Sequence, residues 1–554
     1  MCVRTYILVF LVFVANNNFA QNSIPIPDTL SGSNIELILK NSTKTFFSTV
    51  ATKTIGYNGN YLGPTLILNK GQEVNLSVTN SLNEQTTTHW HGLHVAPHND
   101  GSPHNPIAIG ERMTRTFPIM DKAGTYWYHP HLHKSTMKQV VKGAAGLIIV
   151  RDEEESKLNL PRKYGVDDIP LVLQFQSFDN NQQILENDEL DNQIIANGTV
   201  KGQLNCPAQI VRLRLLNGSS HRVFRLGFTN NITFYQITSD DGLLNKPVQL
   251  NRLNLGSGER AEILLDLSKM EGKTVELLTF GNELPTGYPG GPAMMSMALG
   301  PLDNKTTQIL TINVTKSTEN PVTTIPTTLS NNEIWQHESG TRNIILSGTP
   351  MMNPTNFYIN NRQFDEKVID FTTNKDRTEV WNITNQSMMA HPFHIHGNYF
   401  YILSINGATP PENMRGRKDV VLVPPMNGNV KLITKYEDFT DDEMPYMYHC
   451  HILSHEDNGM MGQFLVSSKT ASSEIEKTNN FIVYPNPVKD LLHIKNMKDS
   501  ARIENATLYN ILGIKVLEQT NINDTISFTG IAPGEYFLKL YFNNKFEINK
   551  VLKL

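Results

Sequence analysis

Residues Pro445–Gly462 read Pro-Tyr-Met-Tyr-His-Cys-His-Ile-Leu-Ser-His-Glu-Asp-Asn-Gly-Met-Met-Gly, and the chemistry of this stretch organises the rest of the chain. The aromatic and apolar residues from Tyr446 to Ile452 predict a β-strand, on which successive side chains point to opposite faces. His449 and His451 therefore face one way, and Cys450 faces the other. We expect two different metal sites on the two faces of one strand, joined covalently through its backbone.

A second pattern follows the cysteine. His455 and Met460 come five and ten residues after Cys450, in a loop that can fold back onto the sulfur. A cysteine thiolate, imidazoles and a weak axial methionine are the ligands of a trigonal blue-copper electron-transfer site. Such a site needs a second histidine from elsewhere in the chain.

The missing histidine comes from the segment His391-Pro-Phe-His-Ile-His396. His394 and His396 share one face by the same period of two, which leaves His391 to stand beside Cys450. Two further pairs nearer the N-terminus make four His-x-His pairs in all: His89/His91, His129/His131, His394/His396 and His449/His451. A lone histidine is usually structural, but four pairs beside a cysteine–methionine loop indicate eight imidazoles that bind further copper ions.

These four segments resemble the signature of the three-domain multicopper oxidases, the laccase-like family that includes bacterial copper-efflux cuprous oxidases, spore-coat laccases and bilirubin oxidases. The resemblance covers roughly residues 30–468 and implies four copper ions: one type 1, one type 2 and a type 3 pair. It implies as type 1 ligands His391, Cys450, His455 and Met460. It gives the type 2 copper to His89 and His394, and the type 3 pair to His91, His129, His131, His396, His449 and His451.

The resemblance also implies a reaction. An enzyme of this family oxidises a phenolic substrate or Cu(I) at the type 1 copper, one electron at a time, and reduces dioxygen to water with four electrons at the trinuclear cluster. Electrons pass from Cys450 through the backbone to His449 and His451. Asp100 and Glu456 match acidic positions that supply protons in the family, since a carboxylate near copper can relay protons. The alternative for both is a solvated loop acid.

The sequence leaves open which electron donor the protein uses and whether it turns over at all. Met294, Met295 and Met297 form a small cluster whose soft thioethers either suit Cu(I) or serve as adaptable packing, so phenols and Cu(I) are equal candidates. The alternative functions are an exported copper-sequestering protein without turnover and a copper-free structural relative, as in some cell-division proteins of this superfamily. A two-domain copper nitrite reductase is disfavoured by the chain length and the full type 3 histidine set.

The composition is typical of a soluble protein with several β-rich domains. The chain has 554 residues, of which 39% are hydrophobic and 18% are charged, values that are ordinary for globular proteins. The formal net charge is −5 and no basic block occurs, so nucleic acid is not an expected partner. The partners that we expect are dioxygen and a small-molecule or Cu(I) electron donor.

The N-terminus is typical of a signal peptide over residues 1–20. Arg4 provides the positive region, Tyr6–Ala15 is the apolar region, and cleavage is predicted after Ala20. A membrane anchor needs around 20 apolar residues, and Asn16–Asn18 interrupts the run too early for that. We therefore expect an exported protein with no transmembrane segment in its mature chain.

Two cysteines remain in that mature chain. Cys450 is assigned to copper, so no disulfide is expected even in a compartment that permits one. Cys206 is predicted to be a small buried hydrophobic residue.

Short strands separated by turns predict an all-β fold over roughly residues 30–468, the region that resembles the family. Expected strands include Ile35–Leu39, Glu73–Thr79, Leu171–Gln176, Val211–Leu216 and Ala261–Leu267. The family implies three cupredoxin-like Greek-key β-sandwich domains, over residues 21–152, 165–315 and 335–468, with the charged segment 151–168 as a linker. The second domain has no His-x-His pair and is expected to be a copper-free spacer. The first and third each contribute two pairs, so the trinuclear cluster is expected at their interface.

The chain changes character after Ser468. A polar linker leads to a further region at residues 478–554, which is predicted to be a small β-sandwich. Its Tyr-Pro-Asn-Pro start at 484–487 and its Lys-Val-Leu-Lys-Leu end at 550–554 resemble the C-terminal sorting domain of type IX secretion. The resemblance implies the type IX machinery as a partner and a secreted or cell-surface protein that passes through the periplasm. An ordinary β accessory domain is the alternative.

Overall fold

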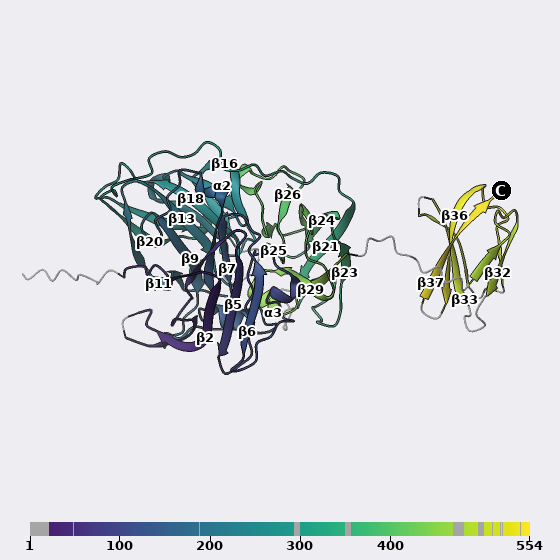
Figure 1. Ribbon diagram of the computed structural model, residues 1–554, viewed down its shortest axis with the longest axis horizontal. Coiled ribbons are helices and arrows are strands. Elements are labelled where there is room, and N and C mark those ends of the chain that lie inside the picture. Colours follow the sequence, from purple (N-terminus) through teal and green to yellow (C-terminus); the bar gives the residue numbers. More distant parts are fainter. Residues whose placement is uncertain are drawn as a thin grey trace, which may run out of the picture. The chain divides into compact units, whose positions relative to one another are not determined.

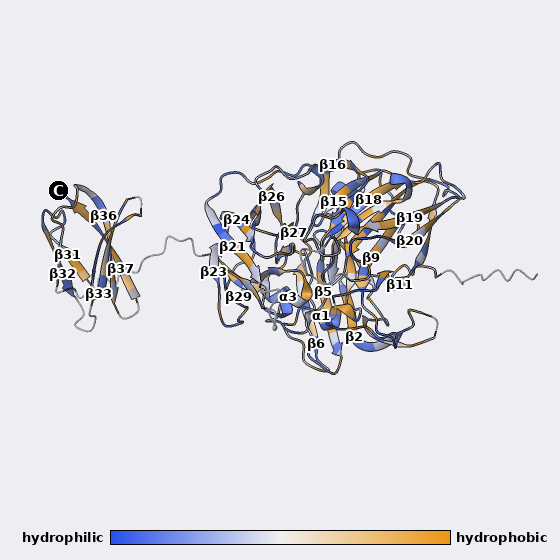
Figure 2. Ribbon diagram, turned by 180° about the vertical axis from the view of Figure 1, so that it is seen from behind, coloured by the Kyte–Doolittle hydropathy of each residue, from blue (hydrophilic) through white to orange (hydrophobic). Residues whose placement is uncertain are grey.

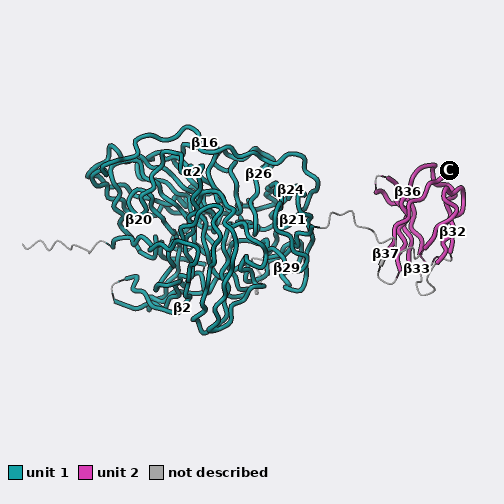
Figure 3. Tube along the Cα trace, in the orientation of Figure 1, with its two compact units in different colours: residues 1–468 teal, residues 469–554 magenta. Residues whose placement is uncertain are grey.

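The structure, a computed structural model, describes residues 22–47, 49–187, 189–292, 300–348, 356–468, 481–496, 503–511, 513–520, 522, 524–542 and 545–554. The chain divides into two compact units, residues 1–468 and 469–554 (Figure 3), which are described separately. Residues 1–20 and the methionines Met294, Met295 and Met297 lie outside the described residues. Among the described residues, no helix combines the length and apolar character that crossing a membrane requires.

The first unit contains three β-sandwiches (Figure 1). One sheet of the first sandwich has the order β3 (Thr52–Tyr57), β2 (Asn34–Lys44), β5 (Glu73–Ser81) and β6 (Arg112–Pro118). The other has the order β1 (Thr29–Ser31), β4 (Thr65–Asn69), β8 (Gly146–Arg151) and β7 (Gly124–Tyr128). Alternate residues of β2 are buried between these sheets, as expected for a strand with one face in the core. The helices η1 (Pro97–Asn99) and α1 (Thr136–Val141) lie in the connections.

The second sandwich has a larger sheet in the order β11 (Thr199–Val200), β10 (Gln193–Ala196), β9 (Asp168–Gln176), β13 (Ile210–Asn217), β18 (Arg260–Asp266), β15 (Phe234–Ser239) and β16 (Gly242–Leu250). Its partner sheet has the order β12 (Gly202–Pro207), β20 (Thr306–Thr315), β19 (Thr274–Phe280), β14 (Phe224–Phe228) and β17 (Leu253–Leu255). The helices η2 (Thr229–Asn231) and η3 (Gly281–Glu283) complete it. Figure 2 shows apolar stretches on β9 and β18, whose residues are almost all buried.

The third sandwich has one sheet in the order β22 (Phe357–Ile359), β21 (Gly340–Gly348), β24 (Thr378–Asn385), β28 (Gly428–Lys435) and β26 (Phe400–Ile405). The other sheet has the order β23 (Phe371–Asn374), β30 (Met461–Ser467), β29 (Asp441–Cys450), β25 (His391–Ile395) and β27 (Val420–Val423). The helices η4 (Glu412–Met414) and α3 (Leu453–Asp457) lie in its loops. The antiparallel register pairs Phe393 with Cys450 and His394 with His449, so both histidine segments of this sandwich lie on adjacent strands.

Two local expectations are refined by the structure. The strand predicted to reach Ile452 ends at Cys450, and α3 begins three residues later. The charged connection between β8 and β9 contains the helix α2 (Glu153–Ser156) and buries Glu155. The Glu155 carboxylate accepts from Arg212, 2.6 Å away, so this charge of the connecting segment is paired in the interior.

Cys206 is buried in the second sandwich, as predicted, and no disulfide includes it. Burial raises the pKa of its thiol to about 12, which keeps the side chain neutral.

The second unit is a small β-sandwich. One sheet has the order β31 (Phe481–Tyr484), β32 (Leu491–Asn496) and β35 (Thr525–Ser527). The other has the order β34 (Lys515–Thr520), β33 (Ile503–Asn510), β36 (Gly534–Phe542) and β37 (Lys545–Lys553). Phe481, Leu508, Leu538 and Val551 are buried in its own core. The all-β prediction is therefore confirmed in both units.

Candidate metal centre

A buried pocket in the third sandwich brings three of the predicted ligands together. Cys450 comes from β29, His391 from β25 and His455 from α3. The Cys450 sulfur lies 3.3 Å from His391 Nδ1 and 3.8 Å from His455 Nδ1, and these two nitrogens are 3.2 Å apart. All three side chains are buried. The loop folds back as expected, because the backbone N–H of Cys450 donates to the carbonyl of Met460, which is itself fully buried.

The imidazoles of this Cys450 pocket are neutral and oriented. Burial lowers the pKa of His391 to about 3, and burial followed by the nearby His391 lowers the pKa of His455 well below its ordinary value. The outer nitrogen of His391, Nε2, lies 2.6 Å from the Ser387 hydroxyl, and Phe357 stacks on His455 with ring centroids 3.7 Å apart. Each ring therefore turns Nδ1 toward the sulfur.

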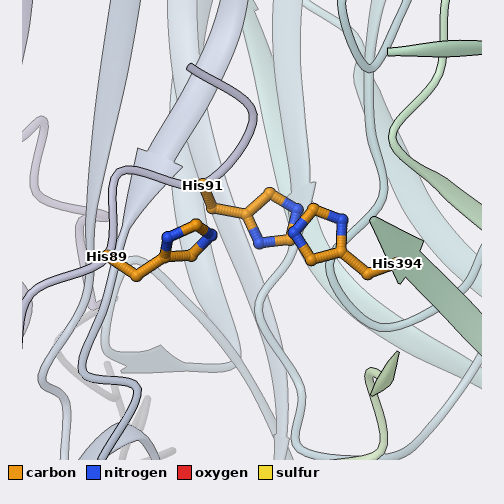
Figure 4. A group of neighbouring side chains, drawn as sticks. All are labelled: His89, His91 and His394. Carbon is orange, nitrogen blue, oxygen red and sulfur yellow. The ribbon is translucent and has the colours of Figure 1, made fainter. Parts of the chain in front are cut away.

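The four His-x-His pairs converge on a second buried site, here called the histidine cluster. It contains three groups of three histidines, and within each group one ring nitrogen of every histidine lies within 4.8 Å of those of the other two. These groups are His89, His91 and His394; His91, His129 and His451; and His131, His396 and His449. Figure 4 shows the first group, in which the rings of His91 and His394 stack with centroids 3.8 Å apart. All eight rings are buried, and they come from the first and third sandwiches.

Several rings of the cluster are anchored through one nitrogen and turn the other inward. The Nδ1 atoms of His89, His394, His129 and His449 lie 2.8–3.0 Å from the backbone carbonyls of Asp100, Asp419, Pro130 and Cys450. A carbonyl only accepts hydrogen bonds, so each of these Nδ1 atoms carries the proton and Nε2 carries a lone pair. Among the described residues, Nε2 of His89, His394 and His451 has no hydrogen-bond partner.

The inward nitrogens fit a metal cation and little else. His396 Nδ1 lies 2.7 Å from the Asp100 carboxylate, so its Nε2 also carries a lone pair. This atom lies 3.1 Å from His449 Nε2, another lone pair, and no proton is left to join them. Two lone pairs at this distance repel each other unless a cation lies between them. Neutral imidazole is a good copper ligand.

Electrostatics keep the cluster unprotonated. Burial, followed by repulsion from neighbouring histidines, lowers the pKa of His91, His394 and His396 well below the ordinary value. The pKa of His449 is lowered to about 3, mainly by burial. The rings are therefore ready to bind metal at neutral pH.

Asp100 and Glu456 both lie against the outer side of the cluster. Asp100 Oδ1 is 3.2 Å from His89 Nδ1, and its other oxygen contacts His396. Glu456 Oε2 is 3.2 Å from His449 Nδ1, and Oε1 is 3.5 Å from His131 Nδ1. Both carboxylates are buried, which excludes solvated loop acids. Burial, followed by the neighbouring Asp457, raises the pKa of Glu456 well above its ordinary value.

Further residues support the predicted ligands. Asp419 Oδ1 lies 3.2 Å from His91 Nε2 although 328 residues separate the two. Trp127 stacks on His129 with centroids 4.0 Å apart, and Ser387 contacts His391. The contact of Ser387 with His391, four residues apart, and that of Trp127 with His129, two residues apart on one strand face, lie within reach of a local pattern, whereas that of Asp419 does not.

Comparisons with known proteins agree with this geometry. A family model described as multicopper oxidase matches residues 39–155, a second one matches residues 336–470, and a model of the secretion system C-terminal sorting domain matches residues 482–553. The multicopper oxidase mco of Staphylococcus haemolyticus (strain JCSC1435) is 36% identical over 474 residues, which are 82% of this chain and 94% of the relative.

Two further matches show the breadth of the superfamily. A laccase-like multicopper oxidase, CueO from the lignin-degrading bacterium Ochrobactrum sp., is 33% identical in its solved structure, with a TM-score of 0.72 over 80% of this chain and 100% of that chain. The cell division protein FtsP of Photorhabdus laumondii is 30% identical over 459 residues, which are 80% of this chain and 92% of that protein.

Family, fold and site agree. The three sandwiches of the first unit are cupredoxin-like, the family uses copper as its cofactor, and the buried rings of this chain fit that metal. The sorting-domain match points to export and to handling by the type IX secretion system. The chain is an oxidoreductase that belongs to the multicopper oxidase family.

Proposed function

We propose that this chain binds four copper ions through twelve residues and catalyses multiple turnovers as an oxidase. Copper bound at these positions supplies one-electron oxidation of a donor and four-electron reduction of dioxygen to water. The observation that carries the proposal is the strand end at Cys450. The sulfur faces one buried pocket, while the adjacent His449 and His451 belong to the histidine cluster on the other side.

The ligand assignment follows the three groups of the cluster. We assign the type 2 position to His89 and His394, whose free Nε2 atoms carry lone pairs. The type 3 positions take the two remaining triads: His91, His129 and His451, and His131, His396 and His449. The type 1 position takes His391, Cys450 and His455, with Met460 as the axial ligand.

Asp100 and Glu456 are proposed to move protons to the cluster. Both are buried carboxylates that touch the outer nitrogens of histidines, and neither Glu456 oxygen has a hydrogen-bond partner among the described residues. An unpartnered buried carboxylate can accept a proton from one side and release it on the other.

Electrons are proposed to pass through the backbone between Cys450 and its two neighbouring histidines, which is the shortest covalent connection between pocket and cluster.

The electron donor is proposed to be a phenol or Cu(I). The Ochrobactrum protein is described as having oxidase activity towards lignin model compounds, which supports the phenolic class. Met294, Met295 and Met297, the residues that would favour Cu(I), lie outside the described residues.

We propose that residues 1–20 are a signal peptide, that the sandwiches span 21–152, 165–315 and 335–468, and that the mature protein is released or held on the cell surface. The sorting region is proposed to cover 478–554 and to take no part in catalysis.

Oxygen consumption tests turnover against copper storage. The copper-loaded full chain is given a phenolic donor, and separately Cu(I), in an oxygen electrode cell. We expect continuous consumption, with four donor molecules oxidised per dioxygen and no hydrogen peroxide. A single burst that stops after a few electrons per chain would instead indicate the sequestering function, and no uptake of copper at all would indicate a copper-free structural role.

A further inference from the structure

The second sandwich, which carries no His-x-His pair, nevertheless reaches the histidine cluster. Its loop from Leu255 to Arg260 enters β18 beside His451. The Ser257 hydroxyl lies 3.4 Å from His451 Nδ1. Gly258 has a φ of +85°, and a Cβ added to it would stand 2.9 Å from the His451 ring. Backbone of the second sandwich is thus packed directly against a ring of the cluster.

Arg260 connects this loop to two further rings through Asp419. Its guanidinium donates to both carboxylate oxygens of Asp419, each over 2.6 Å. Such a bidentate pair fixes the orientation of the carboxylate as well as its charge. Both side chains are buried, so water does not compete for the pair.

Asp419 in turn holds one ring from each of the other two sandwiches. Its Oδ1 atom lies 3.2 Å from His91 Nε2, and its backbone carbonyl lies 2.8 Å from His394 Nδ1. These are the outer nitrogens, so His91 Nδ1 and His394 Nε2 are turned inward. The partner of the outer nitrogen sets the tautomer and the orientation of a metal-binding histidine.

The Arg260–Asp419 pair is closely packed on both sides. Gly92, directly after His91, has a φ of +89°, and a Cβ there would lie 2.5 Å from Arg260 Nη2 and 2.6 Å from Asp419 Oδ2. On the other side, the Arg260 backbone N–H donates to Asp240, which also binds Lys418 over 2.8 Å. All three sandwiches meet at this one buried ion pair.

We propose that Arg260 of the second sandwich is a positioning residue of the trinuclear centre. It orients the Asp419 carboxylate, which keeps His91 in its metal-binding tautomer, and it fixes the residue whose backbone carbonyl does the same for His394. The inference rests on the proposed copper assignment. It gives the second sandwich a role at the centre in place of the spacer role expected from the sequence.

The test compares Arg260→Leu and Asp419→Asn with Arg252→Leu in the copper-loaded full chain. Arg252 is a matched control, because it is an arginine of the same sandwich whose bidentate partner is the partly exposed Glu283. Copper retention is measured against a chelator, alongside the blue band and the type 2 paramagnetic resonance signal. Removing an outer partner of a ligand typically costs about 10–100-fold in metal affinity.

We expect both Arg260→Leu and Asp419→Asn to release cluster copper at a chelator concentration about 10–100-fold lower than the wild type requires. Arg260→Leu should also alter the type 2 hyperfine splitting, because Arg260 fixes the residue whose backbone carbonyl holds His394. The blue band should stay unchanged, and Arg252→Leu should match the wild type. Arg260→Lys, which keeps the charge but loses the two-pronged contact, should fall between.

Three results would overturn the inference. Unchanged copper retention and resonance in both variants would show that the pair does not position the rings. Loss of the blue band together with cluster copper would show a general structural role, and Asp419→Asn, which preserves side-chain shape, decides this if Arg260→Leu does not fold. A wild-type chain that binds fewer than four coppers would instead refute the assignment on which the inference rests.

Discussion

The Cys450 pocket and the histidine cluster are built in opposite ways from the same strand. The pocket is local: its residues come from one sandwich and lie between His391 and Met460. The cluster is assembled from the first and third sandwiches, and the second supports it through Arg260. The pocket should therefore depend on one domain being folded, whereas the cluster depends on three domains being docked.

The surroundings of the two sites differ as much as their construction. In the pocket, the outer nitrogen of His391 contacts the neutral hydroxyl of Ser387. In the cluster, outer nitrogens of His396, His91 and His449 contact the carboxylates of Asp100, Asp419 and Glu456, in addition to the backbone carbonyls that hold several rings. A site that only passes electrons needs no proton donors, while reduction of dioxygen to water does. Asp100 and Glu456 therefore lie where the proposed reaction would require protons.

The largest effect is expected from Cys450→Ser, which separates the two sites. The hydroxyl cannot replace the soft thiolate, so the blue band and turnover should disappear, while the cluster keeps its three coppers and a type 2 signal. Copper analysis and visible spectra check this outcome. Cys206→Ser, at the other buried cysteine, is the control and should remain blue. A Cys450→Ser protein that is still blue would refute the ligand assignment.

Glu456→Gln should leave the Cys450 pocket intact and slow the reduction of dioxygen at the histidine cluster. The amide has nearly the same shape but cannot relay a proton, and positioned acid–base groups contribute about 100-fold or more to rate. We expect steady-state oxygen consumption to fall by about that factor with an unchanged blue band. Glu443→Gln, on an exposed position of β29, is the control. Equal rates for the two variants would remove Glu456 from the proton path.

Acid should destabilise the copper-free protein, and mostly through the cluster. The pKa values of seven cluster rings and of His391 and His455 are lowered by burial. Below the ordinary value near 6.5 the unfolded chain binds protons that the folded chain does not, so stability falls as pH decreases from there. Each ring contributes up to about 1.4 kcal/mol per pH unit.

We therefore expect the free energy of unfolding of copper-free protein to drop by several kcal/mol, at least ~3, between pH 6.5 and 5.5. Urea unfolding at both pH values checks the drop. Replacing His129 and His131 by Gln should flatten the pH dependence more than His391→Gln alone. A free energy that is independent of pH in this window would mean that the metal-free rings are exposed to solvent.

The smallest change is expected from Met460→Leu, which alters the pocket without removing a strong ligand. The loss of a weak axial donor should raise the type 1 reduction potential and preserve the blue colour. Redox titration of the blue band measures this shift. Met461→Leu is the control, because the next methionine is also buried but belongs to the neighbouring strand β30. A lowered or unchanged potential would count against Met460 as the axial ligand.

The sequence predicted the elements that repeat at short range and missed those that tertiary packing creates. The period of two placed Cys450 and His449 on opposite faces, and the His-x-His spacing identified eight rings that the structure gathers. Asp419 carried no such signal, because its contact with His91 joins distant segments of different sandwiches. The burial of Glu155 within the charged segment carried no such signal either, because it depends on Arg212, which lies 57 residues away in the second sandwich.

The most direct test of the account is the copper content of the purified, copper-loaded full chain, measured together with its visible and resonance spectra. The two-site account predicts about four coppers per chain, one of them intensely blue, one type 2 signal and a near-ultraviolet shoulder from the remaining pair. A blue protein with a single copper would contradict the histidine cluster as a metal site. A colourless protein with three coppers would contradict the Cys450 pocket.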